Sequence, residues 1–474
     1  MESKLNTSSV ITEKIYPESA VVSTEKLSFS TKVSYGLGDF SSQLFWTFSG
    51  TYLTIFYTDV VGFTPAVVAM IMLFARILDG VKDPVIGMIA DRTKSRHGRF
   101  RPYILYGTPL LALFSVLTFT VPSFGGNMEA KIAWAIITYI GLGVLYTVVN
   151  LPYGSLAAVM SKDPSERTAL SSFRMFSSNL GTILLSTISM PLIIFFSSGT
   201  GEKVTARGYT MTAFILAAIA IPLFYLVFIK CKEVVQPVHT GKISIKQSIS
   251  AIIMSKSLVC IFLILLLSLT AFFGRIGVQI YYYLYVIKRM DLISLLMPLP
   301  AIGAAIGIVL FTRLAKTFGK KKMLYFAYTG SAIALGFLYF IDYSNLPLLF
   351  IGTFVFGLMQ YSTPIVIAMV PDAIDEIECQ KGIRLDGTAY AATSISTKFA
   401  SALGGAGTVA LLGYFGYVAN AEQTAEAIHG INIVVNIAPA VLYLLAIIPV
   451  MMYSLTDEKT KAIRDELDQK QVLK

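Results

Sequence analysis

The chain has 474 residues, of which 55% are hydrophobic and only 14% carry a charge. An average soluble domain carries about 25% charged residues, so the composition excludes an ordinary soluble enzyme and a disordered protein. The net charge of +10 is concentrated in short segments between apolar runs, which argues against nucleic-acid binding. Runs of this length argue against a transmembrane barrel and indicate a polytopic helical membrane protein.

The polar segment 1–31 has no apolar core, so we expect no cleavable signal peptide. Twelve apolar segments follow, each long enough to cross a hydrocarbon core of about 30 Å as a helix. We expect these spans at 34–58, 65–90, 102–122, 132–158, 170–196, 208–230, 257–286, 293–316, 323–341, 346–371, 389–416 and 430–455.

The spans divide into two halves of similar length. The basic loops "DRTKSRHGRFRP" and "RLAKTFGKKK" follow the second span of each half. Two similar halves of six spans predict an all-α membrane protein with the twelve-helix major facilitator fold. The expected parts are an N-terminal tail (1–31), a first half (32–230), a middle loop (231–256), a second half (257–456) and a C-terminal tail (457–474).

Loop charge predicts the orientation of the chain in the membrane. Alternate loops, beginning with the loop after the second span, carry 18 Lys and Arg residues, and the loops on the opposite side carry 5. The positive-inside rule therefore predicts that both termini and the middle loop are cytoplasmic. We expect a multi-pass protein of the cell (inner or plasma) membrane.

The second span, "ARILDGVKDPVIG", contains four charged residues: Arg76, Asp79, Lys82 and Asp83. Each costs roughly 2.5–3.5 kcal/mol at the centre of a membrane helix, so this face must point into the bundle or a wet cavity. Helical spacing places two carboxylates on one face with a cation on each side. Such a pair suits a small cation or an exchangeable proton, and the alternative is a static network of buried ion pairs.

The first span is unusually polar. Asp39, Ser42, Gln43, Trp46 and Ser49 recur at steps of about three or four residues and share a face. Hydroxyl and amide groups beside an indole are typical of a sugar site, because the indole packs on the apolar face of the ring. Interhelical packing is the alternative interpretation.

Isolated cations occur in three later spans, and we expect each to face the interior. Arg174 lies in the fifth span, Arg275 in the seventh and Lys398 in the eleventh. Lys398 is the strongest candidate for a functional role, whereas Arg275 is explained equally well by helix pairing. The glycine-rich runs "GAAIG" (303–307) and "GGAG" (404–407) predict close helix packing.

An acidic group lies where the tenth span meets the following loop. With Arg384, Asp372 could form a gating ion-pair latch to the basic loops, which include Arg96 and Arg99; a solvated loop is the alternative. The chain has no Walker-type nucleotide motif, and its three histidines lie far apart. We therefore expect no enzyme activity, no cofactor and no bound metal besides a coupling cation.

The motifs "SYGLGDF", "FYTDVVG", "ARILDGVKDPVIG", "RHGRFRPYIL" and "NLPYGSLA" resemble the glycoside–pentoside–hexuronide:cation symporter family, which includes the melibiose carriers. "VPDAIDEIECQKGIRLDGTAY" in the second half agrees with it. The resemblance covers about 32–465 and is strongest to the glucuronide and pentoside carriers. It implies a major facilitator fold, a central sugar site and cation coupling.

Within this resemblance, Asp79 and Asp83 match the cation-binding carboxylates and Thr147 matches their partner on the fourth span. Asp59, Arg76 and Lys82 are expected to support these charges. The residues expected to bind substrate are Ser42, Gln43, Trp46, Asn150, Arg174, Thr363 and Lys398.

Several positions depart from the melibiose carriers. Those carriers have Lys-Asp where this chain has Ser42 and Gln43, Asp where it has Asn150, and Trp where it has Gly154 and Thr363. The missing carboxylates argue against a galactoside substrate. We also expect no phosphotransferase-like tail of the kind that some lactose carriers have.

We therefore expect a secondary transporter that imports a glycoside, pentoside or hexuronide with a cation, acting as a monomer in the lipid bilayer by alternating access. The alternatives are a non-transporting membrane sensor or scaffold, and an exporter of another small molecule. Na⁺-using relatives have Asn where Lys82 stands, and an ammonium there would compete with Na⁺ for Asp79 and Asp83. The sequence thus favours H⁺ over Na⁺.

Overall fold

The computed structural model describes residues 26–93, 95–161, 163–197, 204–234, 255–381, 386–419 and 421–472. Every regular element within these ranges is a helix, which confirms the all-α class. The elements of the first half are α1 (Phe29–Ile55), η1 (Phe56–Val60), α2 (Pro65–Arg92), α3 (Arg101–Thr118), η2 (Phe124–Gly126), α4 (Met128–Met160), α5 (Pro164–Phe196) and α6 (Ala206–Lys230).

The second half follows the same order of predicted spans, and a further helix lies in the C-terminal tail. Its elements are α8 (Lys256–Tyr281), η3 (Tyr282–Ile287), η4 (Met290–Leu292), α9 (Ile293–Leu296), α10 (Leu299–Phe318), α11 (Lys320–Phe340), α12 (Leu346–Leu358), α13 (Ser362–Ile367), α14 (Val370–Lys381), α15 (Asp386–Tyr414), α16 (Ala425–Asn432), η5 (Ile433–Ile437), α17 (Ala438–Met452) and α18 (Asp457–Val472).

Nine helices in the described part of the chain are long and apolar enough to cross a membrane. Helices α1, α2 and α3 occupy the first three predicted spans but are not among these nine. Helix α1 is rich in hydroxyl groups, α2 contains the four charged residues of its motif, and α3 contains Arg101, two tyrosines and two prolines, which lower its mean hydropathy. The twelve crossings themselves stay a prediction.

The helices begin where the sequence supplies a cap. Ser28, Thr64, Asp163, Thr205 and Ser255 each accept a hydrogen bond from a backbone N–H in the first turn of the following helix. These bonds satisfy donors that have no partner within the helix. Such residues therefore fix the starts of α1, α2, α5, α6 and α8.

The span predicted at 346–371 is not one continuous helix. It consists of α12, α13 and the start of α14, with breaks near Gln360 and Ala368. Pro364 and Pro371 lack the N–H that would continue the hydrogen-bond ladder across these breaks.

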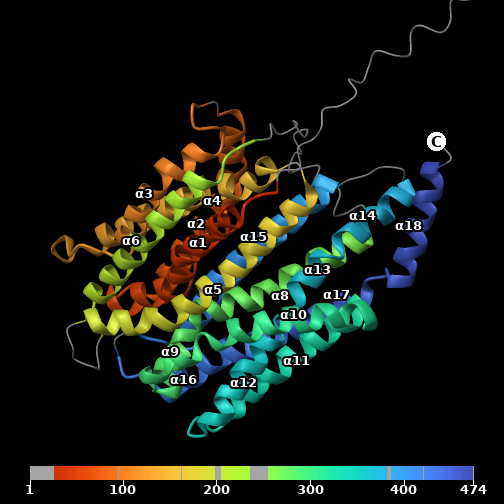
Figure 1. Ribbon diagram of the computed structural model, residues 1–474. Coiled ribbons are helices and arrows are strands. Elements are labelled where there is room, and N and C mark those ends of the chain that lie inside the picture. Colours follow the sequence, from red (N-terminus) through yellow and green to blue (C-terminus); the bar gives the residue numbers. More distant parts are fainter. Residues whose placement is uncertain are drawn as a thin grey trace, which may run out of the picture.

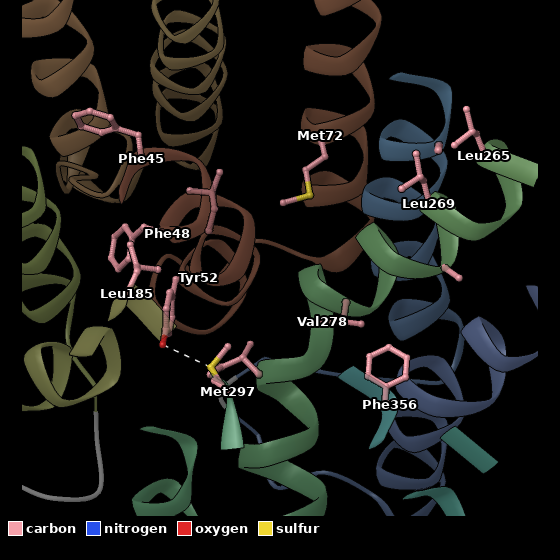
Figure 2. Packing of buried hydrophobic residues seen from close by; sticks show 14 of the residues in the cluster. Phe45, Phe48, Tyr52, Met72, Leu185, Leu265, Leu269, Val278, Met297 and Phe356 are labelled. Atoms are coloured by element: carbon pink, nitrogen blue, oxygen red, sulfur yellow. Dashed lines mark hydrogen bonds between the residues drawn. The ribbon is translucent and has the colours of Figure 1, made fainter. Parts of the chain in front are cut away.

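The two halves meet along α15, which packs against α8 of its own half and α2 of the other. In Figure 1, α3, α4 and α6 lie on one side of the molecule and α11, α12 and α17 on the other, with α5, α8 and α15 between them. Figure 2 shows a buried contact across this boundary, in which the Tyr52 hydroxyl donates to Met297 Sδ at 3.7 Å.

Close helix packing is confirmed for part of the glycine-rich runs. A Cβ at Gly307 would lie 2.2 Å from the Leu358 carbonyl oxygen, and a Cβ at Gly404 would lie 2.7 Å from the Thr270 carbonyl oxygen. Gly405 differs, because a Cβ there would meet no atom within 4 Å. Helix packing therefore explains Gly404 but not its neighbour.

Candidate functional site

A cavity of about 520 Å³ lies between the two halves of the chain. Helices α1, α2, α4 and α5 line it from the first half, and α8 and α15 line it from the second. The cavity contains all four charged residues of the α2 motif as well as Lys398 of α15. The charged face of α2 thus points into a space shared by both halves, as its insertion cost requires.

Asp79 lies between two cations of its own helix. Its carboxylate is 3.1 Å from Arg76 Nη1 and 2.6 Å from Lys82 Nζ. Arg76 also donates to the Tyr139 hydroxyl at 3.4 Å. The negative charge of Asp79 is therefore paired with two cations of the same helix, at i−3 and i+3, the spacing at which helical side chains meet.

Asp83 is held by residues from two other helices. Its carboxylate accepts a hydrogen bond from Thr147 Oγ1 of α4 at 3.0 Å and lies 3.0 Å from Lys398 Nζ of α15. Both members of this ion pair are partly exposed to the cavity, at 23% and 33% of their side-chain surfaces. The pair joins the first half to the second half across the cavity.

An aromatic surface lies beside these charges. The ring of Trp46 packs against that of Tyr146 with centroids 5.1 Å apart, and the Arg76 guanidinium lies 4.9 Å from the Trp46 ring. Both rings line the cavity. A sugar can pack its apolar face on such rings.

Two polar residues of α1, Gln43 and Ser42, are already hydrogen-bonded within the protein. Gln43 donates to Ser178 Oγ at 2.8 Å and accepts from Thr47 Oγ1 at 2.8 Å, and it lines the cavity. Ser42 accepts a hydrogen bond from Asn150 Nδ2 at 3.0 Å, and neither of these two residues is among the lining residues. Gln43 can therefore offer a ligand only its remaining amide valences.

Arg174 does not line the cavity. Its guanidinium donates to both carboxylate oxygens of Asp39, at 2.9 and 3.1 Å, and lies 5.0 Å from the Tyr153 ring. The pair joins α5 to α1 within the first half. Asp39 shares the polar face of α1, but the sequence does not indicate that its partner lies 135 residues away.

Two other candidates lie away from the cavity. Thr363 lies in α13 and is not a lining residue. Asp59 lies in η1, where it accepts hydrogen bonds from the hydroxyls of Tyr285 and Tyr417, both in the second half. The adjacent Thr58 hydroxyl is 2.7 Å from that of Tyr281. Asp59 thus joins the halves at one end of the bundle and does not contact the α2 charges.

The proposed gating residues occupy separate places. Arg96 is exposed. The Arg99 backbone N–H donates to both Glu233 carboxylate oxygens, at 3.0 and 2.8 Å. Asp372 pairs with Lys320, the first residue of α11, and with Arg464 of α18, the latter at 3.1 Å. Arg384 lies outside the described residues.

The cavity also contains residues that the sequence did not single out. Thr182 of α5 and Thr397 and Ser401 of α15 supply hydroxyl groups. Ser401 lies one turn beyond Lys398, so the face of α15 that holds the cation could have revealed it. Thr182 lies in an unremarkable part of the fifth span. Across the described residues, no group of three or more His, Cys, Asp and Glu side chains could hold a metal ion.

Comparisons with known proteins identify the family of the chain and cover almost its whole length. The family model described as "MFS/sugar transport protein" matches residues 34–457. The isoprimeverose transporter of Lactiplantibacillus pentosus is 34% identical over 95% of this chain and 94% of its own length. The glucuronide carrier protein homolog of Escherichia coli (strain K12) is 30% identical over 94% of this chain and 96% of its own length.

Solved structures support the fold at lower identity. The nucleoside transporter NupG has a TM-score of 0.61 at 13% identity, covering 90% of this chain and 99% of its own. A D-xylose-proton symporter has a TM-score of 0.59 at 16% identity, covering 88% of this chain and 97% of its own. At these identities the likeness concerns the arrangement of helices.

Proposed function

Because the chain belongs to the MFS/sugar transport protein family, it is a membrane transporter and not an enzyme, and we propose that it imports a glycoside, pentoside or hexuronide together with a cation. Relatives named as an isoprimeverose transporter and a glucuronide carrier homolog support this range of substrates. The observation that carries the proposal is the ion pair between Asp83 and Lys398, which crosses a cavity shared by both halves.

The ion pair supplies a mechanism for coupling. When a cation or proton occupies the Asp83 carboxylate, the attraction to Lys398 falls, and the α2–α15 contact loosens. When the carboxylate is empty, the pair reforms and holds the halves together. A sugar bound between the same helices therefore responds to the same rearrangement, as alternating access requires.

The surroundings of Asp79 favour H⁺ as the coupling cation. Arg76 and Lys82 already neutralise its carboxylate. At about 4 Å and an effective dielectric constant of 20, two unit charges interact by roughly 4 kcal/mol, so Lys82 competes with Na⁺ for Asp79 and repels the ion itself. A proton needs one carboxylate oxygen and no shell of six ligands.

A cationic substrate site also suits an anionic sugar. Arg76, Lys82 and Lys398 outnumber Asp79 and Asp83 in the cavity lining. A uronide carboxylate in such a site pairs with Lys398 once Asp83 is protonated, because an unpaired carboxylate in a dry cavity is costly. The other predicted sugar contacts, at Ser42, Asn150, Arg174 and Thr363, require a rearrangement of the helices.

We further propose that the protein acts as a monomer in the plasma membrane with both termini in the cytoplasm. The excess of Lys and Arg in alternate loops supports this orientation. It places the Asp59 contact on the extracellular side and the contacts of Asp372 on the cytoplasmic side. The boundaries at 32–230 and 257–456 are the proposed limits of two bundles that rock about the cavity.

The test is an uptake screen in membrane vesicles with labelled glycosides, pentosides and uronides. An inward proton gradient should drive accumulation of at least one probe above its external concentration. Absence of uptake of every probe under proton and sodium gradients, with the protein folded in the membrane, would indicate a sensor or scaffold. Gradient-driven efflux without uptake would indicate an exporter.

A further inference from the structure

Three of the helices that line the cavity each contribute a glycine to its wall. Gly50 of α1, Gly277 of α8 and Gly405 of α15 line the cavity, and a Cβ at any of them would meet no atom within 4 Å. Gly404 is the contrasting case, because its Cβ would lie 2.8 Å from the backbone nitrogen of Gly274. Helix packing therefore accounts for Gly404 but leaves the three cavity glycines unexplained.

The backbone conformation does not require glycine at these three positions either. Each lies inside an α-helix, where alanine is the better helix former. The protein has room for a methyl group at each position, and all three glycines line the cavity. The space that these glycines leave open is therefore available to a ligand.

Gly50 and Gly405 lie at a different level of the cavity from Gln43 and Lys398. Gly50 is seven residues beyond Gln43, and Gly405 is seven residues beyond Lys398. Seven residues are two turns, so each glycine shares a face with its partner about 10 Å further along the helix. Both helices continue from there toward the contact between Asp59 and the Tyr417 hydroxyl, so both displacements have the same direction.

The part of the cavity near Gly50 and Gly405 has the surface of a neutral sugar site. Phe272 and Phe273 of α8 supply apolar ring surface to the cavity. Ser49 also lines the cavity, and its buried hydroxyl has no hydrogen-bond partner in the protein. A buried hydroxyl without a partner is costly, and rotation of the Ser49 side chain toward the cavity would let a sugar hydroxyl satisfy it.

We propose that the glycine-walled end of the cavity is a second subsite, which holds the neutral second unit of a two-unit glycoside while the first unit lies among Asp83, Lys398 and Trp46. The size of substrate that the protein accepts then depends on the space left open at Gly50, Gly277 and Gly405. This inference rests on the proposed function, because it concerns the same cavity.

The experiment compares a disaccharide probe, isoprimeverose, with a single-ring probe, methyl xyloside, in proton-driven uptake. The variants are Gly50→Ala, Gly277→Ala, Gly405→Ala and the triple variant. Added methyl groups narrow the second subsite alone, so the triple variant should raise KM for the disaccharide by about tenfold or more, the effect of a methyl group in a fitted pocket. Uptake of the single-ring probe should stay at the parent level.

Gly407→Ala is the matched control. It lies on the same helix as Gly405, its Cβ would also meet no atom within 4 Å, and it does not line the cavity. It should leave uptake of both probes unchanged. Thermal unfolding in detergent should show no loss of stability in any variant, since alanine favours the helix.

Each other outcome overturns the inference. Unchanged disaccharide uptake in the triple variant, or an equal loss of both probes, shows that the glycines do not bound a second subsite. A parent protein that accumulates only the single-ring probe also contradicts it, while leaving the proposed transport function intact. A parent that accumulates neither probe nor any other sugar overturns the proposed function as well.

Discussion

The two halves of the chain meet through two carboxylates whose partners differ in kind. Asp83 in the cavity pairs with the Lys398 ammonium, whereas Asp59 at the end of the bundle accepts hydrogen bonds from the hydroxyls of Tyr285 and Tyr417. Protonation removes the charge on which an ion pair depends, but a hydroxyl can still hydrogen-bond to a protonated carboxyl group. The cavity contact is thus suited to sense a cation, and the Asp59 contact to act as a latch.

The largest expected effect comes from removing the charge in the cavity. Replacing Asp83 or Asp79 with Asn should abolish gradient-driven accumulation, because the amide cannot take up the coupling cation. Exchange of sugar across the membrane should survive, since Lys398 and Trp46 remain to hold the sugar. Counterflow and gradient-driven uptake in the same vesicles separate these two activities.

The matched control is Asp291→Asn. Asp291 pairs with Arg289 at 2.7 Å but has 61% of its side chain exposed and does not line the cavity. This variant should accumulate sugar like the parent. If both single cavity variants also concentrate substrate like the parent, the cation site on α2 is wrong.

The next effect concerns which cation is used. Lys82→Asn removes the ammonium that lies 2.6 Å from Asp79 and restores a neutral oxygen ligand there. We expect this variant to gain Na⁺-stimulated uptake, whereas the parent shows none. The measurement is uptake under a sodium gradient without a pH gradient or membrane potential, and strong Na⁺-dependent accumulation by the parent would contradict the H⁺ assignment.

A smaller effect is expected at the latch. The double variant Tyr285→Phe and Tyr417→Phe removes both tyrosine donors from Asp59 without changing any charge. The Thr58 hydroxyl, which donates to Asp59 at 2.5 Å within the first half, is retained. A hydrogen bond to a charged group contributes about 1.5–3 kcal/mol, so the latch should open more often while coupling persists. Alkylation of a cysteine introduced by Val60→Cys, next to Asp59 in η1, should become faster in this background. An unchanged alkylation rate would show that the tyrosine hydroxyls do not hold the latch.

The smallest effect on coupling is expected from the ion pair within the first half. The side chains of Arg174 and Asp39 are only 28% and 15% exposed. Replacing one partner with a neutral residue should therefore lower the thermal unfolding temperature. Removing one partner of a buried pair costs about 3–5 kcal/mol, and this partly exposed pair should lose less. The double variant Asp39→Asn, Arg174→Gln should recover stability beyond the sum of the single changes; additive losses would show that the pair contributes nothing.

The sequence predicts the positions of the helices far better than it predicts which side chains pair between them. Apolar length and caps such as Ser28 and Thr64 are local properties, so the positions of the helices follow from them. Pro364 and Pro371 are visible in the sequence, but hydropathy alone favours a continuous tenth span and does not predict its breaks near Gln360 and Ala368. Family resemblance supplied the fold because its motifs recur in order along the chain.

The partners of the charged residues depend on which helix faces which, and no local pattern contains that information. Lys398 and Asp83 were each expected to face the interior, yet their ion pair joins residues on α15 and α2. Asp59 was grouped with Arg76 and Lys82 by its motif, although it lies among tyrosines of the other half. Gly405 adjoins Gly404 in the sequence, but only the packing distinguishes the glycine that faces a helix from the one that faces the cavity.

The most direct test measures proton and sugar movement together in liposomes containing the purified protein. Adding a transported sugar to a weakly buffered suspension should make the medium alkaline as protons enter with the sugar. The Asp83→Asn variant should give no pH change while retaining sugar exchange. Sugar uptake by the parent without proton movement, or proton movement that persists in Asp83→Asn, would contradict coupling through the Asp83–Lys398 pair.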